Sequence, residues 1–199
     1  MIRLSRLVLI ALLVLGSQVL SDAQSKKKKP SPIIADYVTE LTHKSGSREP
    51  IKKTGRYYRD EDGRTRLEIG DQVTIFDPAK KMTYTLDTAR KTAKQAYAAG
   101  LGAIESRVKP QSSIDLGERR IEGLRCVGKR STVTVPARPG VPSVMGTVET
   151  WLSPELGLPV LTILQYADVA ITETYKNLKA GTKPDSKLFA VPADFKVTQ

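Results

Sequence analysis

Nucleophilic catalysis is the first chemistry to test, because the chain holds one histidine, His43, and one cysteine, Cys126. A serine or cysteine nucleophile needs a histidine base that a third group holds in place. His43 lies in a stretch with the composition of a β-strand, and no serine has the flanking glycines of a nucleophile elbow. Cys126 is expected to be a small buried residue on a strand. The sequence therefore predicts no catalytic residues and a protein that is not an enzyme.

Metal and cofactor chemistry finds equally little support. One histidine and one cysteine exclude a Cys/His zinc site of the usual type. The three successive acids at 60–62 lack the spacing of a calcium loop and are expected to solvate a turn. Gly100 and Gly102 lack the third glycine of a dinucleotide site. We predict no metal and no cofactor. A catalytic pair of carboxylates is assembled in space, so the sequence leaves that alternative open.

The charge balance is strongly basic, with 32 Lys and Arg against 21 Asp and Glu, a formal net charge of +11. Nucleic-acid binding needs a reading element or stacking aromatics within the basic surface. Here the basic residues are scattered and aromatic residues make up only 6% of the chain. We predict no nucleic-acid partner. A basic surface could still dock an envelope module onto an anionic polymer, lipid or protein, and this is the alternative function.

Residues 1–23 have the three regions of a secretory signal peptide. Arg3 and Arg6 precede the apolar run 7–15, and small residues stand where cleavage after residue 23 requires them. The run is shorter than the roughly 20 apolar residues that span hydrocarbon, although an uncleaved anchor is the alternative. Cleavage would remove two Arg and one Asp and leave 176 residues with a net charge of +10. The protein is expected to be exported, to the periplasm or the extracellular space.

Residues 24–35 are expected to form a basic, proline-containing tail. Four consecutive lysines at 26–29 repel one another, and Pro30 and Pro32 oppose helix formation. Such a segment is typically solvated. Its alternative role is attraction to anionic lipid headgroups, at about 1 kcal/mol per basic residue near a membrane surface.

The remainder, 36–199, is predicted to be one mainly β domain. Apolar and polar residues alternate in short stretches rich in β-branched and aromatic side chains. Asp62-Gly63 is typical of a hairpin, and Asp77-Pro78 of a type I turn. Nine sequentially neighbouring strands imply a meandering antiparallel sheet. The expected strands are 36–44, 54–59, 64–69, 73–76, 82–86, 124–135, 147–152, 160–166 and 170–177.

Two segments depart from the strand pattern. Within 93–108, apolar residues recur at steps of four, three and four, which is helical spacing. The segment is expected to be a short helix laid over the sheet, or a connector. Its apolar positions are lid candidates: Tyr97, Leu101, Ile104 and Val108. Residues 185–189 are expected to be a capped helical turn that Pro192 ends.

Several motifs carry a resemblance to a known family. They are residues 55–66, 74–78, 84–87, 121–123, 132–136, 149–156 and 188–197. Together, the upstream and the downstream motifs resemble a group of exported bacterial proteins. The closing pattern, Trp151 with Ser-Pro-Glu-Leu and then Leu-Phe-x-Val-Pro-x-Asp-Phe-Lys, is similar to the end of LolA/LolB-like periplasmic lipoprotein carriers. The resemblance implies an open, curved antiparallel sheet or half-barrel, α+β with one or two short helices, whose apolar concave face accepts acyl chains.

The leading hypothesis is therefore an exported, non-enzymatic carrier of an apolar or amphiphilic ligand, a lipid or the acyl chain of a lipoprotein. One uncovered apolar face of a single sheet must be buried by curvature, by residues 93–108 or by a ligand. Alternating apolar residues on the predicted strands are candidates for the groove, and plain core is their alternative role. These candidates are Val73, Ile75, Met82, Tyr84, Leu86, Val148, Trp151, Leu161 and Ile163.

Overall fold

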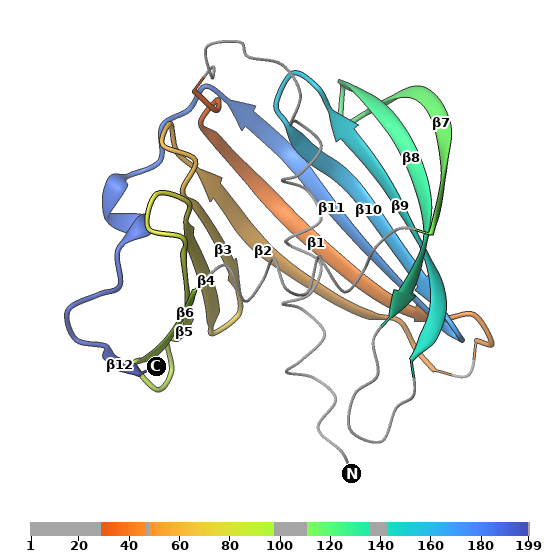
Figure 1. Ribbon diagram of the computed structural model, residues 1–199. Coiled ribbons are helices and arrows are strands. Elements are labelled where there is room, and N and C mark those ends of the chain that lie inside the picture. Colours follow the sequence, from red (N-terminus) through yellow and green to blue (C-terminus); the bar gives the residue numbers. More distant parts are fainter. Residues whose placement is uncertain (1–28, 47, 98–110, 136–142, 199) are drawn as a thin grey trace.

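The computed structural model describes residues 29–46, 48–97, 111–135 and 143–198. They form a single open sheet of twelve strands that curves into an arch (Figure 1). The predicted mainly β, curved architecture is confirmed. The strands are β1 (Ile33–His43), β2 (Ile51–Arg59), β3 (Thr65–Ile69), β4 (Gln72–Asp77), β5 (Met82–Asp87), β6 (Thr92–Tyr97), β7 (Ser112–Ile121), β8 (Leu124–Val135), β9 (Val144–Ser153), β10 (Leu158–Tyr166), β11 (Val169–Ala180) and β12 (Lys196–Thr198).

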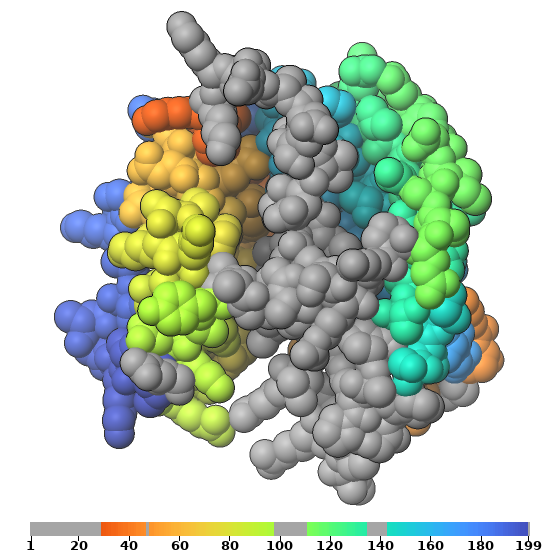
Figure 2. All heavy atoms as spheres, viewed as in Figure 1, coloured from red at the N-terminus to blue at the C-terminus, as the bar shows by residue number. Residues whose placement is uncertain are grey.

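The sheet consists of two meanders joined at its centre. Strands β1 to β6 follow one another outward in one direction, and β11 back to β7 follow outward in the other. The joint is the antiparallel pair β1–β11, and only β12, beside β6, is parallel to its neighbour. In the space-filling view the residues of β3–β6 and those of β7–β9 form the two opposite sides of the molecule (Figure 2).

Two turns of the same kind shape the β4–β6 side. Asp77 Oδ1 accepts hydrogen bonds from the amides of Ala79 and Lys80, and Asp87 Oδ1 accepts one from the amide of Arg90. Each turn is five residues long and ends on a lysine with positive φ, 53° at Lys81 and 51° at Lys91. An aspartate that bonds amides two or three residues ahead is a local turn device. The repeat therefore delivers two hairpins in succession.

The second of these turns leads into a strand where a helix was predicted. Residues 92–97 form β6, which pairs with β5 along its whole length and buries Ala93. The helical spacing begins at Tyr97, the last residue of β6, so the apolar pattern that suggested a helix starts where this strand ends. The other lid candidates, Leu101, Ile104 and Val108, lie outside the described residues.

Three of the twelve strands were not predicted: β6, β7 and β12. Almost every residue of β7 is exposed, and β12 is three exposed residues long, so neither shows apolar alternation. Their backbones are ordered by pairing with β8 and β6. In addition, β1 begins at Ile33, inside the range 24–35 that was assigned to a tail. Ile33 and Ala35 are buried there, and burial extends the strand beyond its expected start at residue 36.

The C-terminal segment lies against the outside of the arch (Figure 1). It contains η2, a short 3-10 helix (Ser186–Phe189), and Asp185 caps it by accepting from the Lys187 amide, so the predicted capped turn is confirmed. Arg66 Nη1 of β3 donates to Leu188 O at 2.8 Å. In the described ranges no helix is long and apolar enough to cross a membrane.

Candidate functional site on the concave face

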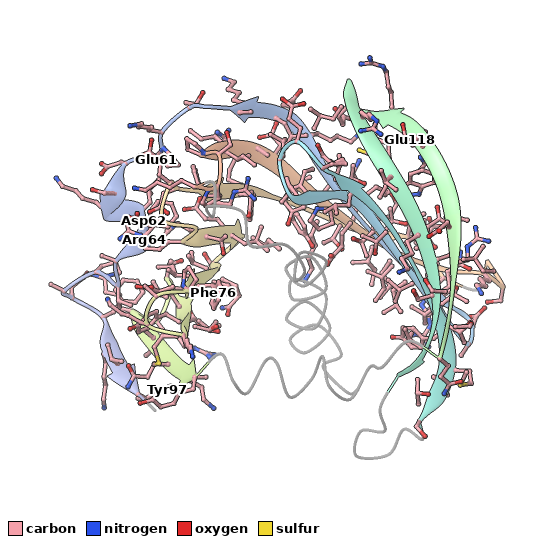
Figure 3. All side chains as sticks on the ribbon, turned by 45° about the horizontal axis from the view of Figure 1, so that its top comes forward. Glu61, Asp62, Arg64, Phe76, Tyr97 and Glu118 are labelled. Atoms are coloured by element: carbon pink, nitrogen blue, oxygen red, sulfur yellow. The ribbon has the colours of Figure 1, made fainter. Side chains whose placement is uncertain are left out.

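Cross-strand pairing assigns each side chain to one face of the arch. Phe76 of β4 points to the concave side (Figure 3), and its register partners Thr65 and Thr83 share that face. Pairing continues from Thr65 to Arg59 and from Arg59 to Ile33 of β1. Alternate residues of β1 and their partners on β11, β10 and β9 therefore also face the concave side. The residues between them face the convex side.

Four of the predicted groove residues form a small core on the convex face. Val73, Ile75 and Leu86 are buried together with Ala93, and Tyr84 packs against them. Val191 and Phe195 of the C-terminal segment cover this cluster. Alternation divides a strand into two sets of residues but does not say which set faces the inside of a curved sheet. The sequence grouped these side chains correctly, and the structure places them beneath a segment of the chain itself.

The remaining candidates divide between the faces. Leu161 pairs with Trp151, and Ile163 pairs with Glu149. Leu161, Ile163 and Trp151 therefore lie on the convex face. Met82 pairs with Asp77 and lies on the same convex side as Tyr84. Val148 is the one candidate that faces the concave side. The lid candidate Tyr97 ends β6 with 73% of its surface exposed.

Trp151 occupies a closed sandwich on the convex face. The Arg119 guanidinium carbon lies 3.8 Å from the ring centroid, and Trp151 Nε1 donates to Glu149 Oε1 at 2.7 Å. On its other side the ring covers Gly128, where an added Cβ would lie 2.5 Å from it. A shallow depression of about 320 Å³ adjoins this sandwich and is lined by Arg130, Thr147, Glu149, Ile163 and Gln165. The Arg130–Glu149 ion pair, 2.7 Å long, occupies part of it.

The concave face carries an apolar row across four central strands. Leu41 of β1 pairs with Ile171 of β11, Ile171 with Leu164 of β10, and Leu164 with Val148 of β9. Ile171 and Val148 are buried, whereas Leu41 and Leu164 are half-buried. We call these four residues the apolar row.

A polar row runs beside it, two residues along each strand. Thr39 of β1 pairs with Glu173 of β11, and Glu173 pairs with Thr162 of β10. The exposed fractions of Thr39, Glu173 and Thr162 are 7%, 7% and 6%. Burial raises the pKa of Glu173 to about 7, and the neighbouring Tyr37 hydroxyl acts in the opposite direction. The carboxyl group therefore exchanges its proton close to neutral pH.

A cluster of tyrosines closes one end of the concave face. Tyr175 lies 5.5 Å from Tyr37 and 4.8 Å from Tyr57 between ring centroids, the second contact being edge to face. Leu156 and Leu158, at the turn from β9 to β10, pack into the same core. Burial raises the pKa of Tyr57 to about 12 and that of Tyr175 well above its usual value. These hydroxyls remain protonated at physiological pH.

The polar row has a signature in the sequence of β11. Ile171, Glu173 and Tyr175 alternate on β11, so the acid stands within the apolar set of its strand. Tyr37, Thr39 and Leu41 follow the same pattern on β1. A polar residue at a position of apolar parity indicates a buried polar group.

His43 has partners that the sequence did not reveal. Its Nδ1 lies 3.3 Å from Asp168 Oδ2, and Ser45 Oγ donates to the same oxygen at 2.8 Å. The Ser45 amide also donates to Asp168 Oδ1, and these two Ser45 bonds are the main reason that the pKa of Asp168 is lowered. In a catalytic triad the serine bonds to the imidazole. Here the serine also donates to the carboxylate, and these bonds join the end of β1 to the turn between β10 and β11.

The cysteine and the acidic residues show no metal-binding arrangement. Cys126 is fully buried on β8, as predicted, and burial raises the pKa of its thiol. Among the described residues no three His, Cys, Asp or Glu side chains are grouped to hold a metal ion.

Comparisons with known proteins identify similar solved structures. No family model and no curated protein matches the chain. A DUF1329 family protein from Desulfovibrio piger is 7% identical with a TM-score of 0.42, covering 81% of this chain and 90% of that one. The lipoprotein LppX of Mycobacterium tuberculosis is 17% identical with a TM-score of 0.39, and the match covers 80% of this chain and 90% of LppX. A LolA superfamily protein from Nitrosomonas europaea is 12% identical with a TM-score of 0.30, and the match covers 80% of this chain and 90% of that protein.

Proposed function

We propose that this protein is an exported, non-enzymatic carrier that holds the apolar chain of an amphiphile, a lipid or a lipoprotein acyl chain, on its concave face. One observation supports this most directly: the apolar row faces the concave side. Among the described elements only η2 packs onto a face of the sheet, and it lies on the convex side of β3 and β4. On the opposite face Leu41 and Leu164 keep part of their surface exposed beside the buried Ile171 and Val148, and an acyl chain would bind against that exposed part.

The size of the row fits a chain of moderate length. Neighbouring strands lie about 4.8 Å apart, so the four strands of the row span roughly 14 Å. Each methylene group that leaves water contributes about 0.8 kcal/mol. A ligand that lies across these strands therefore gains binding free energy for each methylene group that covers the exposed parts of Leu41 and Leu164.

Two adjacent residues of β10 provide a matched test. Leu164 belongs to the apolar row, whereas Ile163 faces the convex side, and both are half-buried. We expect Leu164→Arg to reduce binding of a fluorescent fatty amphiphile to the full chain at least tenfold, because a charge on the row loses burial of several methylenes. Ile163→Arg should bind as the wild type does. Equal losses in both variants, or loss only in Ile163→Arg, would falsify the concave site.

Export is the second part of the proposal. It rests on residues 1–23 and predicts a periplasmic or extracellular protein, which fractionation of cells that express the full chain would test. Docking through the basic surface is the competing function, and salt distinguishes the two. Surface charge attraction weakens steeply as ionic strength rises, whereas burial of an acyl chain does not. Uptake of the fluorescent amphiphile should therefore be the same at low and at high salt.

A further inference from the structure

The concave face holds an unusual concentration of buried polar groups next to the apolar row. Glu173 lies between Thr39 and Thr162 in register, and all three are more than nine-tenths buried. Buried carboxyl and hydroxyl groups are costly unless they are hydrogen-bonded. Glu173 takes part in none of the ion pairs among the described residues, and its pKa responds to burial and to Tyr37 alone.

Tyr37 supplies an independent observation. It stands two residues before Thr39 on β1, is 1% exposed, and its hydroxyl has no hydrogen-bond partner of standard geometry. A side-chain hydrogen bond to the Glu173 carboxyl, of looser geometry, is nevertheless among the causes that raise the pKa of Tyr37. The second such hydroxyl, that of Thr83, also faces the concave side. A buried hydroxyl whose hydrogen bond has poor geometry costs folding free energy and marks a place where a ligand can supply a better bond.

The charges around this position favour one headgroup chemistry. The cross-strand neighbours of Glu173 are threonines, and along β11 its neighbour on the same face is Tyr175. The basic residues of the same row lie farther off: Lys53, beside Thr39, is two strands from Glu173, and Lys129, beside Thr150, is three strands away. A carboxylate or phosphate headgroup would lie against the Glu173 carboxyl and be repelled when that carboxyl is ionised. A headgroup that donates hydrogen bonds would instead bond to the carboxyl oxygens.

We propose that Glu173 and Tyr37 form the headgroup site of the bound amphiphile, and that this site takes a hydrogen-bond-donating amine or alcohol in preference to an anionic headgroup. The inference rests on the proposed function, because it places the headgroup beside the polar row and the chain along the apolar row. It adds the class of ligand. Glu173 accepts from the ammonium or hydroxyl group, and the Tyr37 hydroxyl gains a hydrogen bond of better geometry in the same complex.

The test compares headgroups at constant chain length. Dodecylamine, dodecanol and dodecanoate would compete with a fluorescent fatty amphiphile for the full-length protein at pH 7.5. We expect the amine to bind at least tenfold more tightly than the carboxylate, because a charge-assisted hydrogen bond replaces repulsion. Glu173→Gln should remove most of the preference for the amine over the carboxylate. The affinity of this variant for dodecanol should stay within about threefold of the wild-type affinity. Glu40→Gln, the same change on the convex face of β1, should leave all three affinities unchanged.

Tyr37→Phe provides a second variant that keeps the aromatic core. It should weaken dodecanol binding about threefold to tenfold, because it removes the hydroxyl that the ligand pairs with. Equal affinities for the three headgroups in the wild type, or an undiminished amine preference in Glu173→Gln, would overturn the headgroup site while leaving the carrier function intact. Failure of all three amphiphiles to compete, with no uptake of the fluorescent probe, would overturn the proposed function and this inference with it.

Discussion

Arg59 Nη2 donates a hydrogen bond to Leu156 O at 2.6 Å and so fastens β2 to the turn between β9 and β10. The same guanidinium donates through Nε to Ser31 O at 3.1 Å. Burial lowers the pKa of Arg59, with the nearby Tyr57 and Tyr175 opposing the shift. One cation thus joins the two meanders at the end of the concave face that the tyrosines close.

Replacement of Arg59 by methionine should therefore loosen that end. Methionine keeps much of the length and apolar contact of the side chain but cannot donate to Leu156 O and Ser31 O. Hydrogen bonds to a charged group contribute about 1.5–3 kcal/mol each, so we expect a loss of roughly 3 kcal/mol in the free energy of unfolding, measured with urea. Arg56→Met is the control, because Arg56 is exposed and lies 3.4 Å from Asp36 in a surface ion pair. Similar losses in both variants would contradict a special role for Arg59.

Gly55 is expected to be intolerant of any side chain. An added Cβ would lie 1.9 Å from Glu68 O, a backbone atom that cannot rotate away. The close approach occurs at the end of β3, beside the last register pair of the β2–β3 ladder, Arg56 with Glu68. Gly55→Ala should cost on the order of 3 kcal/mol or prevent folding, as followed by circular dichroism and urea unfolding. Thr54→Ala, at an exposed neighbouring position, should change stability by less than about 0.5 kcal/mol; a benign Gly55→Ala would show that the two strands are farther apart.

Glu173 makes stability depend on pH in a defined direction. The pKa of its carboxyl is about 7 in the folded protein against 4.5 in an open chain. Its contribution is therefore fully present below about pH 4.5 and is lost as the pH rises through 7, because ionisation leaves a buried charge. The difference corresponds to at most about 3 kcal/mol.

Urea unfolding of the wild type and of Glu173→Gln across pH 4.5–8 would measure this contribution. The variant should gain stability relative to the wild type as the pH rises, and Glu40→Gln should follow the wild type. A constant difference between wild type and Glu173→Gln over the whole range would show that the carboxyl is not held in a low-polarity environment.

Trp151, the single tryptophan of the chain, offers a local probe of the convex face. Gly128→Ala would place a methyl group against its ring, which is already held from the other side by Arg119. We expect the ring to be displaced toward solvent, with a red shift of its fluorescence and a loss of about 1–3 kcal/mol in stability. Lys129→Ala, an exposed neighbour, should leave the emission unchanged. An unshifted spectrum in Gly128→Ala would mean that the sandwich is looser than the ring contacts indicate.

Local chemistry explains which parts of the fold the sequence could predict. Asp62-Gly63, Asp77-Pro78 and the Asp185 cap each act within a few residues, and the elements beside them are present where expected. The second Asp turn, at Asp87, repeats the first and could have predicted β6. In contrast, most of β7 is exposed and only Leu116 and Ile121 pack against the core, so its sequence carries too sparse an apolar pattern to predict a strand.

The candidate site shows the same division. Alternation correctly grouped Val73 with Ile75 and Tyr84 with Leu86, because their periodicity is a property of each strand. Which group faces inward depends on the direction of curvature and on the C-terminal segment that covers Val73 and Ile75. Those are long-range properties. Glu173 stands among the apolar residues of its own strand. That polar residue at an apolar position indicates the concave face more directly than the alternation of Val73 and Ile75 does.

The order of the strands also sets when the protein can fold. The central pair joins the first described strand to one near the end of the chain, Leu41 to Ile171, 130 residues later. Hairpins within either meander can form early from nearby residues, but the seam between them must await almost the entire polypeptide. Contacts this distant in sequence slow folding. A partly synthesised chain would thus carry two unjoined halves, and the concave face, which crosses the seam, would form last.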